Sequence, residues 1–494
     1  MIGLTAFGAY IPRLRLSRRS IVDAHRWNQP GLARLGKGER AMCNWDEDSL
    51  TMAVEAARDC LEGMRDSAVP AVYLGSTTLP FEDRQNAGIL GAALGLGEDV
   101  RTADVTSSQR AGTSALMAAL EAARGGEGGS LVVASDQRRT KAGAAQELQF
   151  GDGAAAFTVG REGVVARLLG MHTLSVDFVD HYRGANREFD YNWEERWIRD
   201  EGFLKIVPRA ISKALADAGV EAERVSRLIL SSTLPRAAEK VAGSLGIPAD
   251  RLADSLHAGV GEAGTAHPPL MLVQALETAG PGEVLVVASF GQGCDVLVFE
   301  TTEAIAELPQ RRGVQGSLAR RREESNYNKF LAFNGLIERE KGMRAEVDNQ
   351  TALTQLYRRR EMLLGLVGGT CDVCGTRQFP KSRVCVNPNC NAMNSQSEFR
   401  FSEVPARIVT WSADHLTYCP DPPLHYGMVQ FDGGGRIFAN FTDVDVGSVE
   451  VGQRMRMMFR VKDYDDQRGF RRYFWKAAPE FAPQAAASAS AAGE

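Results

Sequence analysis

Residues 1–302 contain the same sequence pattern twice, in the same order and at nearly the same spacing. Three pairs of segments match: LGSTTLP and LSSTLP end at Pro80 and Pro235, AGT begins at Ala111 and Ala263, and LVVAS begins at Leu131 and Leu285. The offsets between the members of each pair are 155, 152 and 154 residues. Three ordered matches at one spacing indicate an internal duplication, and duplicated units often place a ligand site where the two copies meet.

The composition is that of an ordinary globular protein. With 494 residues, of which 44% are apolar and 24% charged, the chain is long enough for two or three domains. Its net charge of −5 lacks the basic excess typical of proteins that bind nucleic acid or anionic membranes. The N-terminus does not resemble a signal peptide, and no apolar run approaches the ~20 residues that span a bilayer. We therefore expect a cytoplasmic protein without a nucleic-acid or membrane partner.

Short β-branched runs alternate with Ala/Leu-rich stretches of helical periodicity in the duplicated region. The strand-like segments are 71–77, 130–136, 154–160, 227–233, 283–290 and 294–300, and the helical ones are 49–63, 113–126, 203–219 and 268–280. This alternation predicts a layered α/β fold with a buried sheet, built from two halves at 1–160 and 161–302.

The remaining chain divides by composition. Residues 303–345 are charged and helix-prone, with no strand signal, and we expect a connecting segment that packs on one of its neighbours. Residues 346–400 hold a short helix, at 353–364, and a cysteine cluster. Residues 401–480 contain five strand-like segments, which favours a small OB-fold barrel. The tail at 481–494 is of low complexity, and we expect it to be disordered.

Four of the eight cysteines fall within 20 residues of one another: Cys371, Cys374, Cys385 and Cys390. Two short turns that each present two thiolates provide the tetrahedral sulfur ligands that Zn²⁺ prefers. The x4 spacing of the second pair is wider than the usual x2. Because four thiolates leave no open coordination position, we predict a structural zinc site that supports folding; reduced, unliganded thiols are the alternative.

Several motifs in residues 1–302 resemble the thiolase superfamily, in particular the branch of hydroxymethylglutaryl-CoA synthase and ketoacyl-ACP synthase III. The motifs are NWDEDSLTM from Asn44, DVTSSQ from Asp104 leading into AGTSAL, SDQR from Ser135, GDGAAA from Gly151 and SFGQG from Ser289. The resemblance implies a duplicated five-layer α/β/α/β/α thiolase fold. It also implies an acyl-CoA thioester substrate, with coenzyme A as part of the substrate, and a homodimer formed through the sheet edge of the first half.

The C-terminal part resembles the zinc-ribbon/OB-fold proteins that accompany thiolases and help to bind acyl-CoA. CDVCG, QFP at 378–380, DPP at 421–423 and FWKAAP carry this resemblance. Aromatic and histidine side chains cluster beside DPP; they are Trp411, His415, Tyr418, His425 and Tyr426. They line a groove for an acyl chain or adenine, or they serve barrel packing and domain docking. The neighbouring run at 429–447 is acidic, which disfavours single-stranded nucleic acid.

The chain departs from this family where the chemistry of the family takes place. The family's nucleophilic cysteine corresponds to Gln109, its general-acid/base glutamate falls near Thr77, its histidine falls near Ser231, and its asparagine falls at Gly261–Glu262. No cysteine lies between Cys60 and Cys294, so no small shift of the alignment restores the nucleophile. The Cys-His-Glu acyl-enzyme mechanism is therefore absent from this sequence.

Two of these positions offer other chemistry. The Gln109 amide can donate a hydrogen bond to a thioester carbonyl and stabilise an enolate, or Gln109 merely fills a degenerate cysteine pocket. Glu262 can act as a general base if it is desolvated. The alternative for Glu262 is an ion pair with Arg110, its counterpart in the first copy.

His257 and His267 flank Glu262 and are the only histidines that the sequence places within reach of the expected site. His267 is the better candidate to replace the missing base, and a structural role is the alternative for both. Ser231, like Ser108 and Ser232, lacks an evident activating base, which favours hydrogen bonding or space filling over nucleophilic attack.

These observations favour a thiolase-fold enzyme that makes or breaks a C–C bond at the β-carbon of an acyl-CoA without a cysteine nucleophile. Aldol or retro-aldol cleavage, Claisen chemistry and decarboxylation remain open, with acyltransferase and C–C lyase as the classes. The alternative is a non-catalytic subunit that binds acyl-CoA and partners a separate thiolase. A true hydroxymethylglutaryl-CoA synthase requires a nucleophile that this sequence does not contain.

Overall fold

The computed structural model describes residues 1–64, 69–126, 128–350 and 352–480, so the tail expected to be disordered lies outside the described residues. The chain divides into two compact units. The first comprises Met1–Leu366 and Phe459–Phe474, and the second comprises Val367–Met458 and Trp475–Glu494. None of the helices in the described ranges combines the length and the apolar character needed to cross a membrane.

A nine-stranded mixed sheet forms the frame of the first unit, with the strand order β11-β12-β13-β8-β1-β7-β6-β4-β5. The first copy of the duplication supplies five strands: β1 (Gly3–Tyr10), β4 (Ala71–Gly75), β5 (Arg101–Val105), β6 (Ser130–Gln137) and β7 (Asp152–Gly160). The second copy supplies four: β8 (Ala166–Ser175), β11 (Val225–Leu230), β12 (Val284–Phe290) and β13 (Gly293–Thr301). The two half-sheets join where Gly3 and Leu4 of β1 pair with Arg167 and Ala166 of β8.

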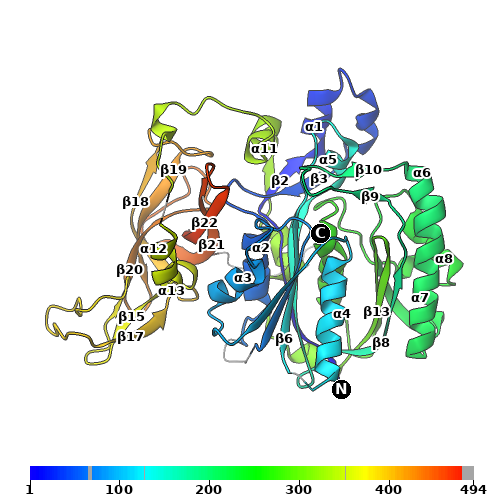
Figure 1. The fold of residues 1–494 in the computed structure, drawn as a ribbon, viewed down its shortest axis with the longest axis horizontal. Coiled ribbons are helices and arrows are strands. Elements are labelled where there is room, and N and C mark those ends of the chain that lie inside the picture. The colour runs from blue at the N-terminus through cyan, green and yellow to red at the C-terminus, as the bar shows by residue number, and fades with distance from the viewer. Residues whose placement is uncertain (65–68, 127, 351, 481–494) are drawn as a thin grey trace, which may run out of the picture. The chain divides into compact units, whose positions relative to one another are not determined.

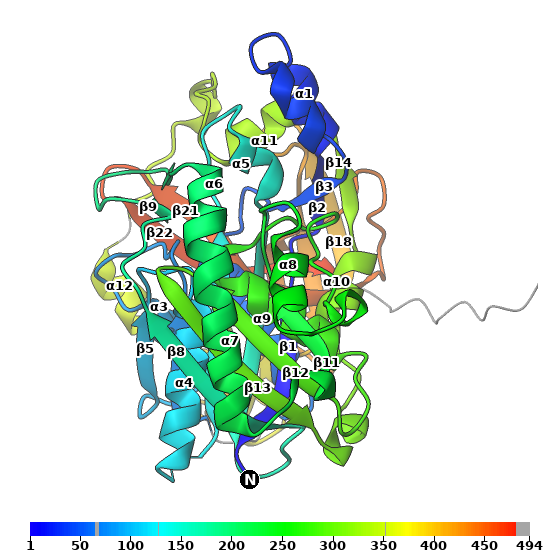
Figure 2. The same ribbon diagram turned by 90° about the vertical axis from the view of Figure 1, so that its right-hand side faces the viewer.

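Helices lie between the half-sheets and on both of their outer faces. The central layer holds α4 (Ala111–Arg124) and α9 (His267–Leu276), which contact strands of both halves. The outer layers are α2 (Ser49–Cys60) and α3 (Asn86–Leu94) on the first half, and α7 (Leu204–Ala218) and α8 (Ala237–Ser244) on the second. Figure 1 shows α4 between β6 and β13, and Figure 2 shows α7 crossing β8 and β13. The predicted five-layer α/β/α/β/α fold is confirmed.

Small side chains allow the central helices to pack closely against both half-sheets. The buried residues of α4 recur at helical spacing, and they are Ala111, Gly112, Thr113, Ala115, Leu116, Ala119, Leu120 and Ala123. From Ala115 on, these residues belong to one apolar core with the apolar residues of α9 from Leu270 to Leu276, and this core also includes strands of both copies. On the outer face, α2 begins with a capping box in which Asp48 accepts from the Thr51 backbone N–H and the Thr51 hydroxyl accepts from the Asp48 N–H.

Residues 176–203, between β8 and α7, form an excursion that lies outside the three matched segments of the repeat. It contains β9 (His181–Tyr182), β10 (Tyr191–Asn192), α6 (Glu195–Trp197) and η2 (Ile198–Phe203). Phe178 stacks on Trp197 within the excursion, with centroids 5.9 Å apart. Phe203 at its end meets Phe290 of β12 edge-on at 5.5 Å and holds the excursion against the second half.

Shorter elements complete the first unit. They are β2 (Leu14–Ser17), α1 (Arg18–His25), η1 (Pro30–Leu35), β3 (Glu39–Met42), α5 (Ala145–Gln149), η3 (Ala222–Arg224), η4 (Ala249–Arg251), η6 (Glu303–Glu307), α10 (Gly313–Ala319), β14 (Arg322–Glu324), α11 (Tyr327–Phe333), η7 (Met343–Ala345), α12 (Leu353–Arg358) and α13 (Arg360–Leu364). The expectation of no strand between 303 and 345 is wrong, because β14 pairs with β2 in parallel. Its REE sequence carries no strand propensity, so the pairing comes from backbone contacts that only the folded chain provides.

The second unit contains two small sheets. A three-stranded sheet carries the cysteine turns and consists of β15 (Val367–Cys371), β16 (Arg377–Gln378) and β17 (Gln396–Arg400). The five predicted strand segments lie in a five-stranded sheet of order β20-β19-β18-β21-β22. Its strands are β18 (Ala406–Asp414), β19 (Leu424–Phe431), β20 (Arg436–Asn440), β21 (Arg454–Asp465) and β22 (Phe470–Pro479), of which β21 and β22 continue into the first unit. An isolated bridge between Phe441 and Ala477 links the two ends of this sheet, as expected for a barrel.

Candidate active site

The two copies of the duplicated pattern meet where α4 and the η5–α9 turn begin (η5 is Gly264–Ala266). A Cβ atom on Gly112 would lie 2.5 Å from the carbonyl oxygen of Thr265 and 2.8 Å from Cβ of Ala134. Glycine at this position therefore permits the close approach of the two equivalent turns. As a result, Gln109 and Glu262, which precede these turns, line the same cavity.

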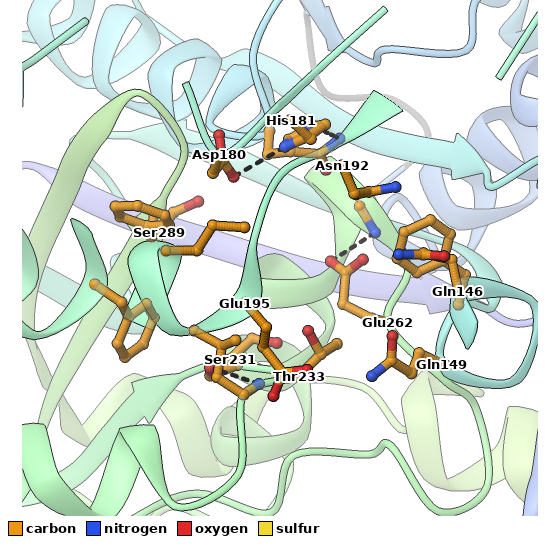
Figure 3. Close-up of a pocket in the computed structure, with 18 of the residues that line it drawn as sticks. Gln146, Gln149, Asp180, His181, Asn192, Glu195, Ser231, Thr233, Glu262 and Ser289 are labelled. Carbon is orange, nitrogen blue, oxygen red and sulfur yellow. Dashed lines mark hydrogen bonds and ion pairs between the residues drawn. The ribbon is translucent and has the colours of Figure 1, made fainter. Parts of the chain in front are cut away.

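This cavity has a volume of about 200 Å³ and lies within the first unit. Of the residues predicted from the sequence, Gln109, Ser231 and Glu262 line it, whereas Thr77 and His267 are not among its lining residues. Figure 3 shows Asp180 and His181 on one side of the cavity, Ser231 and Thr233 on the other, and Glu262 between them. The excursion at 176–203 supplies part of the wall.

The Gln109 amide is held by a hydrogen bond at each end. Nη1 of Arg138 donates to Oε1 of Gln109 over 3.2 Å, and Nε2 of Gln109 lies 3.4 Å from Nε2 of His181. Because arginine only donates, the amide oxygen faces Arg138 and the amide nitrogen faces His181. Gln109 therefore presents N–H groups, rather than a carbonyl, on the side of His181.

Glu262 is engaged through both carboxylate oxygens. Arg138 Nη1 lies 2.6 Å from Oε2, and the Gly264 backbone N–H donates to Oε1 over 3.0 Å. The Arg138 guanidinium is also 3.3 Å from Asp190 and lies over the Phe150 ring at 3.7 Å. Burial acts to lower the pKa of Arg138, but the carboxylates of Glu262 and Asp190 outweigh it, so the pKa stands above its usual value. Glu262 thus completes an ion pair rather than presenting a free base.

The expected pairing of Glu262 with Arg110 is wrong, because Arg110 binds Asp295 instead, at 2.5 Å. Asp295 is buried near the start of β13 and also accepts from the hydroxyls of Thr113 and Ser114. The repeat offset places Arg110 and Glu262 at equivalent positions, but equivalent positions related by a duplication need not touch each other.

The Thr77 side chain belongs to a hydrogen-bond network around the buried Asp136. Its hydroxyl donates to Oδ2 over 3.1 Å and its backbone N–H donates to Oδ1 over 2.8 Å. Asp136 also accepts from Ser76, Thr78 and the Thr265 backbone N–H, so it links the first copy to the second. Thr77 therefore holds a turn near the cavity, and its hydroxyl is already used as a donor.

Ser231 has a histidine partner that sequence reasoning did not find. Its Oγ lies 3.3 Å from Nε2 of His257, whose ring stacks on that of His267 with centroids 4.9 Å apart. Burial and the neighbouring His267 lower the pKa of His257 to about 3. A base of that strength does not ionise a serine hydroxyl at neutral pH, so Ser231 still lacks effective activation.

His267 is fully buried, and both of its ring nitrogens are used by the backbone. Nδ1 accepts from the Ala263 N–H over 3.1 Å, and Nε2 lies 2.8 Å from the carbonyl oxygen of Ser255. Burial lowers its pKa to about 4, so the ring is neutral at pH 7. These contacts are those of a structural histidine, the alternative weighed from the sequence.

A third histidine, His181, lies in the cavity, so the expectation that only His257 and His267 come within reach is wrong. Its Nδ1 lies 2.8 Å from Oδ2 of Asp180, and its Nε2 faces Gln109. No sequence motif pointed to His181, because the excursion that carries it lies outside the duplicated pattern. Arg138 was equally missed, although it ends the SDQR motif; a buried arginine beside two carboxylates is recognisable only in three dimensions.

The three cysteines described in residues 1–302 are buried away from the cavity lining. Burial raises the pKa of Cys60 to about 12 and raises the pKa values of Cys43 and Cys294 well above their ordinary range. A thiol that resists ionisation is a poor nucleophile. Among the residues that the structure describes in this unit, none supplies a thiolate to the cavity.

In the second unit, the four clustered cysteines come together as predicted. The Sγ atoms of Cys371, Cys374, Cys385 and Cys390 all lie within 4.8 Å of one another. Cys374 and Cys385 lie 3.5 Å apart, and Cys371 and Cys390 lie 3.9 Å apart, between Sγ atoms. Tetrahedral sulfur ligands about 2.3 Å from a zinc ion would be roughly 3.8 Å apart, so this donor set fits a metal of that size.

The aromatic cluster of the second unit is spread over its sheet. His425 is buried, whereas Trp411 is 40% exposed and Leu416 nearby is 69% exposed. Tyr426 contacts Phe438, 5.4 Å away between ring centroids. The cluster therefore combines a buried histidine that packs in the barrel with partly exposed aromatic rings.

Two family models match parts of the chain. Residues 215–298 match 3-oxoacyl-[acyl-carrier-protein] synthase III C terminal, and residues 402–460 match the ChsH2 C-terminal OB-fold domain. Hydroxymethylglutaryl-CoA synthase from Caldivirga maquilingensis is 26% identical over 346 residues, which cover 68% of this chain and 98% of that relative. The Aeropyrum pernix enzyme of the same name is 28% identical over 342 residues, covering 68% and 94%.

Solved structures show the same fold for the thiolase-like region. A hydroxymethylglutaryl-CoA synthase complexed with CoA has a TM-score of 0.60 at 17% identity and covers 71% of this chain and 94% of its own. The 3-oxoacyl-(acyl carrier protein) synthase III of Pseudomonas aeruginosa PAO1 has a TM-score of 0.54 at 20% identity, covering 61% and 98%. The chain thus joins a thiolase-like region, similar to hydroxymethylglutaryl-CoA synthase and ketoacyl-ACP synthase III, to a C-terminal OB-fold domain of the ChsH2 type.

Proposed function

We propose that this protein is an enzyme that makes or breaks a C–C bond at the β-carbon of an acyl-CoA, without forming an acyl-cysteine. Relatives named hydroxymethylglutaryl-CoA synthase match this chain over nearly their full lengths, and this similarity supports an acyl-CoA substrate. The observation that carries the proposal is Gln109, whose amide faces the cavity at the start of α4 where those relatives are expected to hold a nucleophile.

An amide in this position suits chemistry through an enolate. Its N–H groups, oriented by Arg138, can hold the thioester oxygen as negative charge develops on it, and a helix N-terminus adds a favourable field. Aldol, retro-aldol and decarboxylation reactions all pass through such an enolate and need no covalent acyl-enzyme. Claisen condensation from an acyl-cysteine does need one, so it is the least compatible of the reactions considered from the sequence.

Two further features of the proposal concern metal and assembly. The four-cysteine cluster would hold a structural Zn²⁺ that stabilises the ribbon.

We also propose a homodimer formed at the sheet edge of the first half. In support, β5 is the terminal strand of the nine-stranded sheet and its residues are only partly buried. Sedimentation of the purified protein at several concentrations tests the assembly.

The second candidate function is that of a non-catalytic acyl-CoA-binding subunit that partners a separate thiolase. The observation that favours it is that Glu262 and Thr77 are both committed to internal contacts, which leaves two of the expected catalytic positions without free groups. If the protein is such a binding subunit, the cavity binds a thioester and Gln109 only fills space.

The test is incubation with β-hydroxyacyl-, β-ketoacyl- and malonyl-type CoA thioesters, with products and intact protein analysed by mass spectrometry. The enzyme reading predicts product without a covalent acyl adduct. It also predicts a loss of at least about 100-fold in Gln109→Ala, because one oxyanion donor contributes about 10²–10³ in rate. Glu262→Gln should lose activity by disturbing Arg138. CoA binding without any product from the whole panel would instead establish the binding subunit.

A further inference from the structure

Asp180 and His181 form a pair of the kind that prepares an imidazole to accept a proton. Asp180 Oδ2 lies 2.8 Å from Nδ1 of His181, and Nε2 of the same ring points to the Gln109 amide nitrogen. A carboxylate at Nδ1 fixes the ring orientation and holds the proton on that nitrogen, which leaves Nε2 as the acceptor. Figure 3 shows this pair at the cavity wall, joined by a dashed line.

The Gln109 contacts select the same tautomer independently. Arg138 donates to Oε1 of Gln109, so the nitrogen of the amide is the atom that faces His181. An N–H donor next to Nε2 requires that nitrogen to carry a lone pair. Two separate partners, Asp180 and Gln109, therefore place the imidazole proton on Nδ1 and expose the basic nitrogen to the cavity.

Other candidate bases of the cavity are less suited to this task. Both oxygens of Glu262 are engaged, by Arg138 and by the Gly264 N–H. His267 is fully buried, and His257 is directed to Ser231. Glu195 also lines the cavity, but it lies on the side of Ser231 and Thr233 (Figure 3).

We propose that His181 is the proton-transfer residue of this cavity, that Asp180 positions it, and that the substrate is a β-hydroxyacyl thioester cleaved by a retro-aldol step. This inference rests on the proposed function and deepens it. A thioester oxygen that accepts from the Gln109 amide is held beside Nε2 of His181, so the β-hydroxyl can replace that amide as the donor to Nε2. The buried Oδ1 of Asp180 has no hydrogen-bond partner among the described residues, which leaves one further acceptor in the cavity wall.

The step balances without a further reactant. The hydroxyl proton passes to Nε2 of His181, the O–H electron pair forms the new C=O bond, and the Cα–Cβ bond breaks. Its electron pair moves into the thioester to give an enolate, whose oxygen accepts from Gln109. The protonated His181 then returns the proton to Cα, so the products are an acyl-CoA and an aldehyde or ketone. One residue acts as base and then as acid.

The test uses two reactions of the full-length protein. The first is cleavage of β-hydroxyacyl-CoA thioesters, and the second is exchange of α-protons of acetyl-, propionyl- and isobutyryl-CoA in D₂O, both followed by mass spectrometry. We expect His181→Ala to lose about 10²–10⁴-fold in both, the range that a general base contributes. Added imidazole should restore activity in proportion to its concentration. His172→Gln is the matched control, because His172 also meets an aspartate, Asp217, but lies outside the cavity lining.

Asp180→Asn tests positioning. It should lower kcat with little change in KM, because the amide can donate to Nδ1 and so favour the wrong tautomer, and Asp180→Glu should recover part of the loss. With ¹⁵N-histidine labelling, the wild-type resonance that disappears in His181→Gln should report a proton on Nδ1. The chain has seven histidines, so one missing resonance is identifiable.

The outcomes separate the two proposals. If the wild type turns over substrate and His181→Ala is equally active, the role of His181 is overturned and the proposed function stands. The same conclusion follows if Glu195→Gln, rather than His181→Ala, loses activity. Failure of imidazole to rescue a folded His181→Ala that has lost activity assigns the histidine a structural role, which also overturns the inference. Absence of both cleavage and exchange in the wild type overturns the proposed function, and the inference falls with it.

Discussion

Arg138 and Glu262 form an ion pair, 2.6 Å long, that joins the two copies of the duplicated unit inside the cavity wall. Arg138 follows β6 of the first copy, and Glu262 precedes the η5–α9 turn of the second. The same guanidinium also orients Gln109. The ion pair therefore both holds the two halves together and sets the geometry of the candidate site. Glu262 holds the guanidinium of Arg138, and Arg138 in turn fixes where the Gln109 amide points.

Replacement of Arg138 by methionine should destabilise the protein strongly. It leaves Glu262 and Asp190 without their shared cation, and loss of one partner of a buried ion pair costs about 3–5 kcal/mol. The free energy of unfolding is measured from urea titrations followed by tryptophan fluorescence. The double variant Arg138→Met/Glu262→Gln should be more stable than Arg138→Met, because it removes one orphaned carboxylate. Equal stability of the two variants contradicts this account of the pair.

The stacked histidines His257 and His267 should make the fold sensitive to acid. Their pKa values are lowered to about 3 and about 4, against about 6.5 in an unfolded chain. Between those values the unfolded state binds protons that the folded state does not, so stability is full above pH 6.5 and falls as the pH drops toward 4. The expected loss for each histidine between pH 7 and pH 5 is about 2 kcal/mol.

His267→Gln should reduce this dependence, since glutamine does not titrate. The measurement compares the free energies of unfolding of wild type and variant at pH 7 and pH 5. A difference between the two proteins that stays constant across this range would show that His267 is not the responsible group. His172→Gln, which changes a more exposed histidine on β8, is the control for the loss of any histidine.

Metal binding should depend on the four clustered cysteines and not on the other thiols. We expect about one zinc ion per purified chain by elemental analysis, since four thiolates form one tetrahedral site. Cys385→Ser should lose the metal and lower the melting temperature, as should treatment with a chelator. Cys419→Ser, which alters a cysteine outside the cluster, should keep full metal content. A metal-free wild type that melts at the same temperature as the zinc-loaded protein contradicts the structural role.

The contact between α4 and η5 should tolerate no side chain at Gly112. Alanine there places Cβ 2.5 Å from the Thr265 carbonyl oxygen, in a turn fixed by both copies, and overpacking of this kind costs about 1–3 kcal/mol. Gly243→Ala is the matched control. Gly243 lies in α8 with open space around it, so alanine there should stabilise the helix by about 0.5–1 kcal/mol. Urea titration of both variants measures the contrast, and a Gly112→Ala protein as stable as wild type would show that the two turns can move apart.

The layered architecture was predictable because it follows from patterns that lie within short segments. Strand segments such as 130–136 and 283–290 are apolar runs of strand length, and the helices between them have apolar residues at helical spacing. The duplication predicted two similar halves, and the spacing of the four cysteines predicted that they cluster as metal ligands. β14 was missed because its charged sequence acquires strand structure only through pairing with β2.

The sequence by itself determined the duplicated layers and the clustered thiols, since both depend on residue type and spacing along the chain. Its resemblance to a known family predicted that Gln109 stands where that family has a cysteine. Only the tertiary structure decided which side chains serve the cavity. It joined Glu262 to Arg138 rather than to Arg110 and buried His267 against the backbone. It also brought His181 to Gln109 from an excursion 72 residues away. Such contacts depend on the path of a segment that lies outside the matched segments of the repeat, and neither periodicity nor offset encodes that path.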